Sequence, residues 1–67
     1  MHEGTVKTVV VDRGFGFIAE ANGPDIFFHV SDVVGMEFDE SLIERRVMFD
    51  VTTSPKGPRA TNVRPAN

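Results

Sequence analysis

The sequence predicts a small all-β barrel made of five short strands. Apolar and β-branched residues recur at every second position along most of the chain, as they do in strands that bury one face. Turn-forming glycine, proline, asparagine and serine residues separate these segments at short intervals. No stretch has the pattern of a long helix, and closing five strands into a barrel removes the edges that an open sheet would expose.

Length and composition limit the protein to a few classes. The 67 residues have room for one domain, which we expect to span residues 1–67. There is no cysteine and no cluster of metal-ligating residues, so we expect no metal and no other cofactor. The N-terminal segment lacks a signal-peptide pattern and apolar runs are short, which predicts a cytoplasmic protein with no membrane partner. The formal net charge of −3 argues against a protein that coats duplex DNA electrostatically.

The first strand is predicted over Glu3–Val11, where β-branched residues dominate. If no bulge intervenes, Val6, Thr8 and Val10 lie on one side of this strand and the residues between them on the other. Asp12-Arg13 then turns the chain into the second strand.

Arg13–Ile18, with the sequence Arg-Gly-Phe-Gly-Phe-Ile, lies in the second strand, which we expect to end near Glu20. A period of two places Phe15 and Phe17 on one face and the glycines on the other. Alternate glycines weaken a strand, so they indicate either strong curvature or two rings left standing open. Open rings beside a cation suit the stacking of unpaired bases. The alternative is that both rings are core residues and the glycines mark a bulge.

Asn22-Gly23-Pro24 is a strong turn signal and predicts that the second strand pairs with a third over Asp25–Val30. One face of this third strand must be core, and the better candidates are Ile26, Phe28 and Val30. Phe27 and His29 then face outward beside the two phenyl rings of the second strand. Clustered exposed aromatic rings on a small domain normally mark a binding site.

A single helical turn is predicted next, capped by Ser31 and stopped by Gly35. The acidic connection Met36–Glu44 follows. Within it, Ser41 precedes Glu44 by three residues, which is the spacing of a capping box and leaves a second short helix open as an alternative to a loop.

The fourth strand is predicted over Arg46–Thr52, with three inward residues: Val47, Phe49 and Val51. Ser54–Pro58 contains two prolines and a glycine, so we expect no regular structure there. Arg59–Val63 is predicted as a short fifth strand and Arg64–Asn67 as a loose tail.

Two motifs together resemble one known family, the bacterial cold-shock proteins. Arg13–Ile18 resembles their first ribonucleoprotein motif, usually Lys-Gly-Phe-Gly-Phe-Ile, and Asp25–Ser31 resembles their second, usually Asp-Val-Phe-Val-His-Phe-Ser. Further matches are Glu3-Gly4, Val6-Lys7, Lys56-Gly57-Pro58 and Asn62-Val63. The resemblance covers the whole chain and implies an OB-fold barrel of five antiparallel strands that binds single-stranded RNA and DNA. An RNA-recognition-motif domain shares the Gly-Phe-Gly-Phe theme but needs two helices, for which this chain has no room.

The resemblance also implies which residues contact nucleic acid. The family's binding roles carry over by position to Lys7, Arg13, Phe15, Phe17, Asp25, Phe27, His29, Phe38 and Lys56. Arg59 is a further cation able to contact phosphates. For Phe38, the alternative is a ring that folds back onto the barrel from its acidic loop. His29 is interpreted as a stacking ring rather than a catalytic base, because no nucleophile or metal partner accompanies it.

The chain departs from the family at several positions. Thr8-Val9-Val10 replaces a Trp-Phe pair followed by Asn, Val30 replaces a Phe, and Glu44 stands where the family usually turns on Gly. Each base–aromatic stack contributes about 1–3 kcal/mol, so losing two stacking positions weakens binding by roughly 2–6 kcal/mol if the losses add. We therefore expect a weaker binder than typical relatives.

Two functions from different classes fit these observations. One is a monomeric single-stranded nucleic-acid binder, acting as an RNA chaperone or as a regulator of transcription or translation in stress adaptation. The other is a small-barrel protein-interaction module with little nucleic-acid affinity, for which the missing aromatics and the net acidity argue. The two retained motifs favour the first. An enzyme is not expected, because cysteine, a metal-ligand cluster and a phosphate-cradling glycine-rich loop before a helix are all absent from the sequence.

Overall fold

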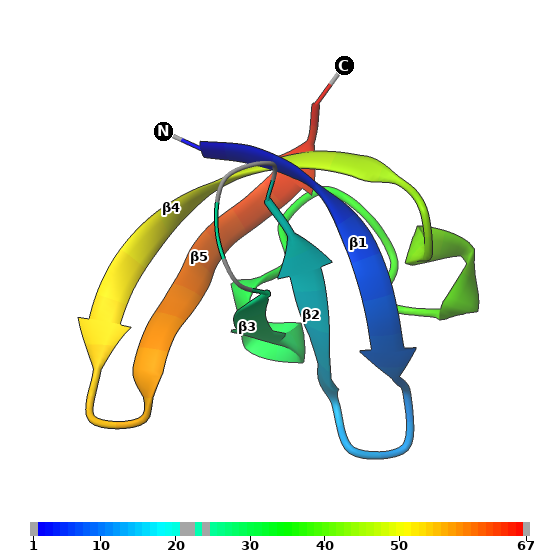
Figure 1. Cartoon of the computed structure of the whole chain (residues 1–67). Coiled ribbons are helices and arrows are strands. Elements are labelled where there is room, and N and C mark those ends of the chain that lie inside the picture. The colour runs from blue at the N-terminus through cyan, green and yellow to red at the C-terminus, as the bar shows by residue number, and fades with distance from the viewer. Residues whose placement is uncertain (1, 21–22, 24, 67) are drawn as a thin grey trace.

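The computed structural model describes residues 2–20, 23 and 25–66. These form five strands and two short 3₁₀ helices (Figure 1). In chain order the elements are β1 (His2–Val10), β2 (Phe15–Ala19), β3 (Ile26–His29), η1 (Val30–Asp32), η2 (Glu40–Leu42), β4 (Arg46–Ser54) and β5 (Gly57–Pro65). None of the described residues belongs to a helix long and apolar enough to cross a membrane.

The five strands close into a barrel in the order β1-β2-β3-β5-β4, which confirms the predicted all-β architecture. Strand β1 curves across the barrel, so that its first half pairs with β4 and its second half with β2 (Figure 1). The pairings β1–β2, β1–β4, β2–β3 and β4–β5 are antiparallel. The closing pair β3–β5 is parallel, and it places Arg59 opposite Phe27. The resemblance implied antiparallel strands, and this short pairing is the exception.

The barrel interior is filled by side chains from all five strands and from η2. The buried core consists of Val6, Ile18, Ile26, Phe28, Leu42, Val47, Phe49, Ala60 and Val63. The predicted inward positions on β4 are confirmed, with Val51 packed at the edge of this cluster. The prediction of Val30 as a core residue is wrong, because β3 ends at His29 and η1 breaks the alternation, leaving Val30 40% exposed.

Gly14, in the turn before β2, and Gly16, within β2, serve different purposes. Gly14 has a φ of +75°, a left-handed conformation that glycine adopts without steric cost. Gly16 is buried, and a Cβ there would lie 2.8 Å from the ring of Phe28 and even closer to the carbonyl oxygen of Thr8. One glycine therefore allows the turn, and the other allows β1 and the Phe28 ring to approach β2 closely.

A β-bulge interrupts the pairing of β1 with β2 between Val6 and Thr8. An extra residue on one strand moves the following side chains to the opposite face. Val6, before the bulge, is buried. After the bulge, Thr8 is exposed and lies opposite Phe17, and Val9 packs against the core. The alternation predicted for a regular first strand does not hold beyond Lys7.

Both short helices are capped differently from the sequence-based prediction. Helix η1 begins at Val30, and its cap is the ring of His29, whose Nδ1 accepts a hydrogen bond from the amide of Ser31. Helix η2 is capped by Asp39, which accepts hydrogen bonds from the amide and the hydroxyl of Ser41. Both hydrogen bonds lower the pKa of the Asp39 carboxyl, and the bond from the Ser41 hydroxyl has the larger effect. The predicted caps at Ser31 and Ser41 are therefore wrong, since both residues lie inside their helices.

Strand β5 is longer than predicted and the hairpin before it is tighter. Ser54 pairs with Gly57 across a two-residue turn, and the Ser54 hydroxyl donates to the Gly57 carbonyl at 2.6 Å. The strand also continues to Pro65, which lies opposite Val47. The predictions of an irregular 54–58 segment and a loose tail are wrong for the residues described. Proline is tolerated at such strand positions when no ladder hydrogen bond requires its amide.

The turn predicted at Asn22-Gly23-Pro24 lies outside the described residues, except for Gly23. The pairing that it was expected to produce is confirmed, because β2 and β3 are antiparallel neighbours from Phe15 opposite His29 to Ile18 opposite Ile26.

Glu44 occupies a left-handed backbone position, with a φ of +71°. This is the position at which the family usually turns on glycine, and the amide of Glu44 donates to the carbonyl of Val6 at 2.7 Å, which ties the turn to β1. A side chain with a Cβ is disfavoured in this conformation, whereas glycine adopts it freely.

We expect Glu44→Gly to raise the free energy of unfolding by about 1 kcal/mol, and the melting temperature by about 4–8 °C, by relieving this strain. Thermal unfolding followed by circular dichroism measures the change. Glu37→Gly is the matched control, because it removes the same carboxylate at an exposed position without positive φ. Equal effects of the two substitutions would show that lost charge, not backbone relief, is responsible.

Candidate nucleic-acid interface

Three phenylalanine rings form one cluster on the outer face of β2 and β3. Phe15 and Phe17 alternate along β2, and Phe27 lies opposite Phe17 in the pairing with β3. The three centroid distances are 5.7 Å for Phe15–Phe27 and 6.0 Å for the other two pairs. All three side chains are only partly buried. Phe28, the next residue after Phe27, points to the opposite face of β3 and is fully buried. The rings therefore support one another and keep surface open to a ligand.

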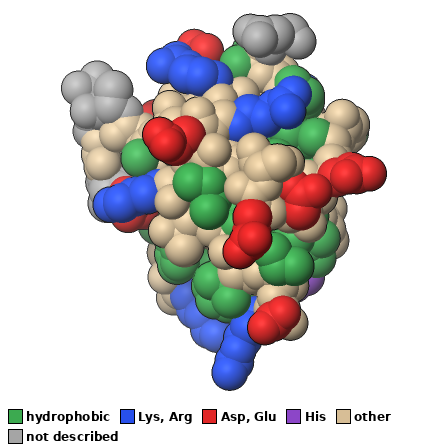
Figure 2. Space-filling model, turned by 90° about the vertical axis from the view of Figure 1, so that its right-hand side faces the viewer, with side chains coloured by type: hydrophobic (Ala, Val, Ile, Leu, Met, Phe, Trp, Pro, Cys, Tyr) green, Lys and Arg blue, Asp and Glu red, His purple; other side chains and the backbone are tan. Residues whose placement is uncertain are grey.

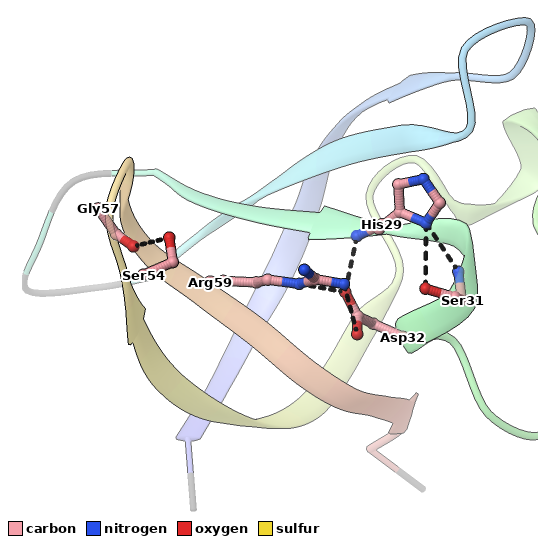
Figure 3. Close-up of polar contacts among 6 residues, drawn as sticks. All are labelled: His29, Ser31, Asp32, Ser54, Gly57 and Arg59. Carbon is pink, nitrogen blue, oxygen red and sulfur yellow. Dashed lines mark hydrogen bonds and ion pairs between the residues drawn. The ribbon is translucent and has the colours of Figure 1, made fainter.

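His29 continues this face at the end of β3, opposite Phe15. Its Nδ1 lies 3.1 Å from the Ser31 hydroxyl and accepts from the Ser31 amide at 3.2 Å (Figure 3). The ring orientation is thus fixed by the start of η1. A half-exposed ring held in this way offers a flat face to a base, as the other three rings do.

A hollow of about 570 Å³ opens beside these rings, and its volume lies in the range typical of small-ligand sites. Strands β2 and β3 provide one wall and the β4–β5 hairpin provides the other. Its lining residues are Phe17, Phe27, His29, Ser54, Pro55, Lys56, Pro58 and Arg59. The hollow thus combines aromatic faces with two cations.

Arg59 forms a two-bond ion pair with Asp32. Its Nε donates to one carboxylate oxygen at 3.0 Å, and its Nη2 donates to the other at 3.2 Å (Figure 3). The amide of His29 donates to the same carboxylate at 3.0 Å. The Asp32 side chain is only 10% exposed and that of Arg59 is 39% exposed. Two parallel N–H···O bonds fix the plane of the guanidinium, so Arg59 is held in one orientation.

The other predicted cations border the same region. Lys7, at the bulge of β1, lies 3.3 Å from the carboxylate of Asp25, and both side chains are exposed. Arg13 lies in the β1–β2 turn and Lys56 in the β4–β5 turn, which are at the same end of the barrel (Figure 1). Figure 2 shows basic side chains at this lower end with an acidic side chain beside them, and both charges on the surface above. The acidic chain thus presents cations where the two hairpins end.

Phe38 does not join the three rings. Its ring packs edge-on against buried Phe28, with centroids 6.0 Å apart, and it belongs to the partly buried residues around the core. This arrangement agrees with the alternative in which the acidic loop folds its aromatic residue back onto the barrel. Seven of the ten predicted contact residues thus belong to the rings, the hollow or the hairpin turns. Of the other three, Lys7 and Asp25 pair with each other, and Phe38 packs against the core.

Asp32 is the residue at this site that the sequence alone did not reveal. It is separated from Arg59 by 27 positions, and only the parallel β3–β5 pairing brings the two together. Opposite charges at two such distant positions are too common in a sequence to indicate an ion pair.

Nearly the whole chain matches the model of one known family. Residues 2–66 match the family model described as the 'Cold-shock' DNA-binding domain. The chain belongs to the cold-shock domain family. Cold-shock domains are single-stranded nucleic-acid binding domains and not enzymes, so the prediction of a protein without catalytic activity is confirmed.

Similar cold shock proteins occur in several bacteria. Cold shock protein ScoF of Streptomyces coelicolor is 43% identical over 67 residues, covering 98% of this chain and 100% of the relative. The probable cold shock protein A of Mycolicibacterium smegmatis is 45% identical over 65 residues, covering 96% and 97%. Among solved structures, drosophila Unr CSD456 has a TM-score of 0.78 at 25% identity, covering 98% of this chain and 26% of that longer chain.

The cold-shock domain described here differs from the family pattern beside the ring cluster. Thr8 is exposed and lies opposite Phe17, where the family has a tryptophan. Residues directly opposite on adjacent strands have their Cβ atoms about 4.5–5.5 Å apart, so a larger ring at position 8 would contact the cluster. Val9, in contrast, packs against the core and cannot reach the outer face.

We expect Thr8→Trp to tighten binding to a pyrimidine heptamer by about 1–3 kcal/mol, the contribution of one additional base stack. Fluorescence anisotropy of a labelled strand measures the affinity, and the new tryptophan, absent from the natural chain, reports base contact through its own emission. Ile43→Trp is the control, because it places the same ring on an exposed apolar position after η2. An unchanged affinity for Thr8→Trp would mean that position 8 does not contact the ligand.

Proposed function

We propose that this cold-shock domain, spanning residues 1–67, binds single-stranded RNA and DNA by stacking bases on its exposed rings. The observation that supports the proposal most directly is the cluster of Phe15, Phe17 and Phe27, whose rings are partly exposed and pack against one another on adjacent strands. Stacking on aromatic platforms tolerates any sequence because every base has a π-face. His29 adds a fourth platform beside the hollow.

The proposed contacts to the backbone come from Lys7, Arg13 and Lys56, with Asp25 as a polar partner of Lys7. Such contacts position a strand without reading its sequence. The inward packing of Phe38 and the small residues at positions 8 and 30 remove stacking platforms, which supports a lower affinity than in relatives that carry aromatic residues at those positions.

We further propose that the protein acts as a monomer in the cytoplasm, as an RNA chaperone or a regulator of transcription or translation during stress. Weak and sequence-tolerant binding suits a chaperone, because the protein must release each RNA after unfolding it. Its bacterial relatives are named cold shock proteins, which supports a role in stress adaptation.

The proposal is tested by titrating the protein into labelled heptathymidine and heptauridine and following fluorescence anisotropy at two salt concentrations. We expect saturable binding whose affinity falls by about 0.7 log units per decade of salt for each phosphate neutralised, with two to four such contacts. Phe17→Leu and Phe27→Leu, which keep apolar bulk but remove the ring, should each weaken binding by about 1–3 kcal/mol.

Val34→Ala is the matched control, since it shortens an exposed apolar side chain outside the ring cluster and the hollow. Absence of binding at low salt and high protein concentration would contradict the proposal. The aromatic face would then be examined as a protein-interaction surface, which is the second functional class.

A further inference from the structure

The ion pair between Arg59 and Asp32 occupies only one edge of the guanidinium. Nε and Nη2 donate to the carboxylate side by side, which leaves the end-on pair of donors on Nη1 and Nη2. Among residues 2–20, 23 and 25–66, no hydrogen-bond partner of Nη1 is found, and no buried side-chain nitrogen lacks a partner. The end-on edge of Arg59 therefore reaches solvent.

The side chain of Arg59 belongs to the hollow that the aromatic platforms line. Arg59 lines the hollow together with Phe27 and His29. Phe27 is its cross-strand partner in the parallel β3–β5 pair, and His29 donates its amide to the carboxylate that holds the arginine (Figure 3). A base in this hollow has a ring on which to stack and a fixed pair of N–H donors within reach of its edge.

We propose that Arg59, positioned by Asp32, recognises a guanine in the bound single strand. Guanine presents two adjacent acceptors, O6 and N7, to which arginine donates two parallel hydrogen bonds, and adenine presents an acceptor beside a donor. In an unpaired strand this edge is open to side chains. The inference rests on the proposed single-strand binding and adds to it a preference for one base at one position.

A phosphate contact is the main competing role for Arg59, and the geometry argues against it. The carboxylate of Asp32 already balances the charge of the guanidinium, which weakens attraction to a second anion. The same carboxylate fixes the plane of the donors, and a fixed plane favours a planar, two-acceptor partner. Asp32 is thus a positioning residue for Arg59.

The experiment uses the whole protein and a set of thymidine heptamers in which one guanine occupies each position in turn. We expect one heptamer to bind about fivefold or more tighter than heptathymidine, the lower end of the range for a two-bond guanine contact. Inosine at that position retains O6 and N7 and should keep the gain. Adenine, cytosine and 7-deazaguanine, which lacks the N7 acceptor, should not.

The variants separate recognition from general affinity. Arg59→Gln should abolish the guanine preference and should weaken binding of the guanine heptamer more than binding of heptathymidine, because the two hydrogen bonds to guanine are lost while stacking is unchanged. Asp32→Asn keeps arginine but removes the charge that holds it, and should reduce the preference. Lys56→Ala, an exposed cation on the same hollow, should weaken all heptamers equally and lower the salt dependence by about one contact.

Each outcome points to one conclusion. Equal affinities for guanine, adenine and cytosine heptamers, with heptathymidine still bound, overturn the guanine inference and leave the proposed function standing. A uniform loss for Arg59→Gln together with a smaller salt dependence assigns the residue to a phosphate and also overturns the inference. If heptathymidine itself does not bind, the proposed function fails first. Circular dichroism melts of the Asp32 and Arg59 variants verify that each remains folded.

Discussion

The packing of Phe28 against Gly16 is the contact on which the rest of the barrel depends. Phe28 is fully buried, and the missing side chain at position 16 gives its ring the space to reach β2. Once this ring is inside, the period of two along a strand sends its neighbour Phe27 outward, and Phe15 and Phe17 beside Gly16 follow. A small barrel cannot enclose all four rings. The core and the aromatic face are therefore two consequences of one steric arrangement.

Further residues reach the aromatic face at places where the regular antiparallel strand pattern is interrupted. The bulge at Lys7 exposes Thr8 beside Phe17, and the end of β3 at His29 leaves that ring fixed by η1. The parallel pairing of β3 with β5 adds Arg59 to the face from a distant part of the chain. Each irregularity directs a polar or small side chain toward the rings, which is how bulges commonly act near functional sites.

The sequence predicted the architecture and the ring cluster because both follow from alternation and from two local motifs. It did not predict the side-chain directions after Lys7 or at Val30, because alternation fails at a bulge and at a strand end. It also missed the Asp32–Arg59 pair, which depends on a contact between strands far apart in the chain. The left-handed backbone at Glu44 is the conformation that the family's usual glycine there would indicate.

The parallel pairing of β3 with β5 is the place where the barrel closes, and it forms the seam of the barrel. It consists of Phe27 opposite Arg59 and Phe28 opposite Ala60, which is a shorter ladder than any other in the molecule described. The hollow lies across this seam, with rings on one side and the β4–β5 hairpin on the other. A nucleic-acid strand bound in the hollow would contact both sides of this seam and would stabilise the closed barrel. Local opening of the barrel and release of the ligand would then be linked equilibria.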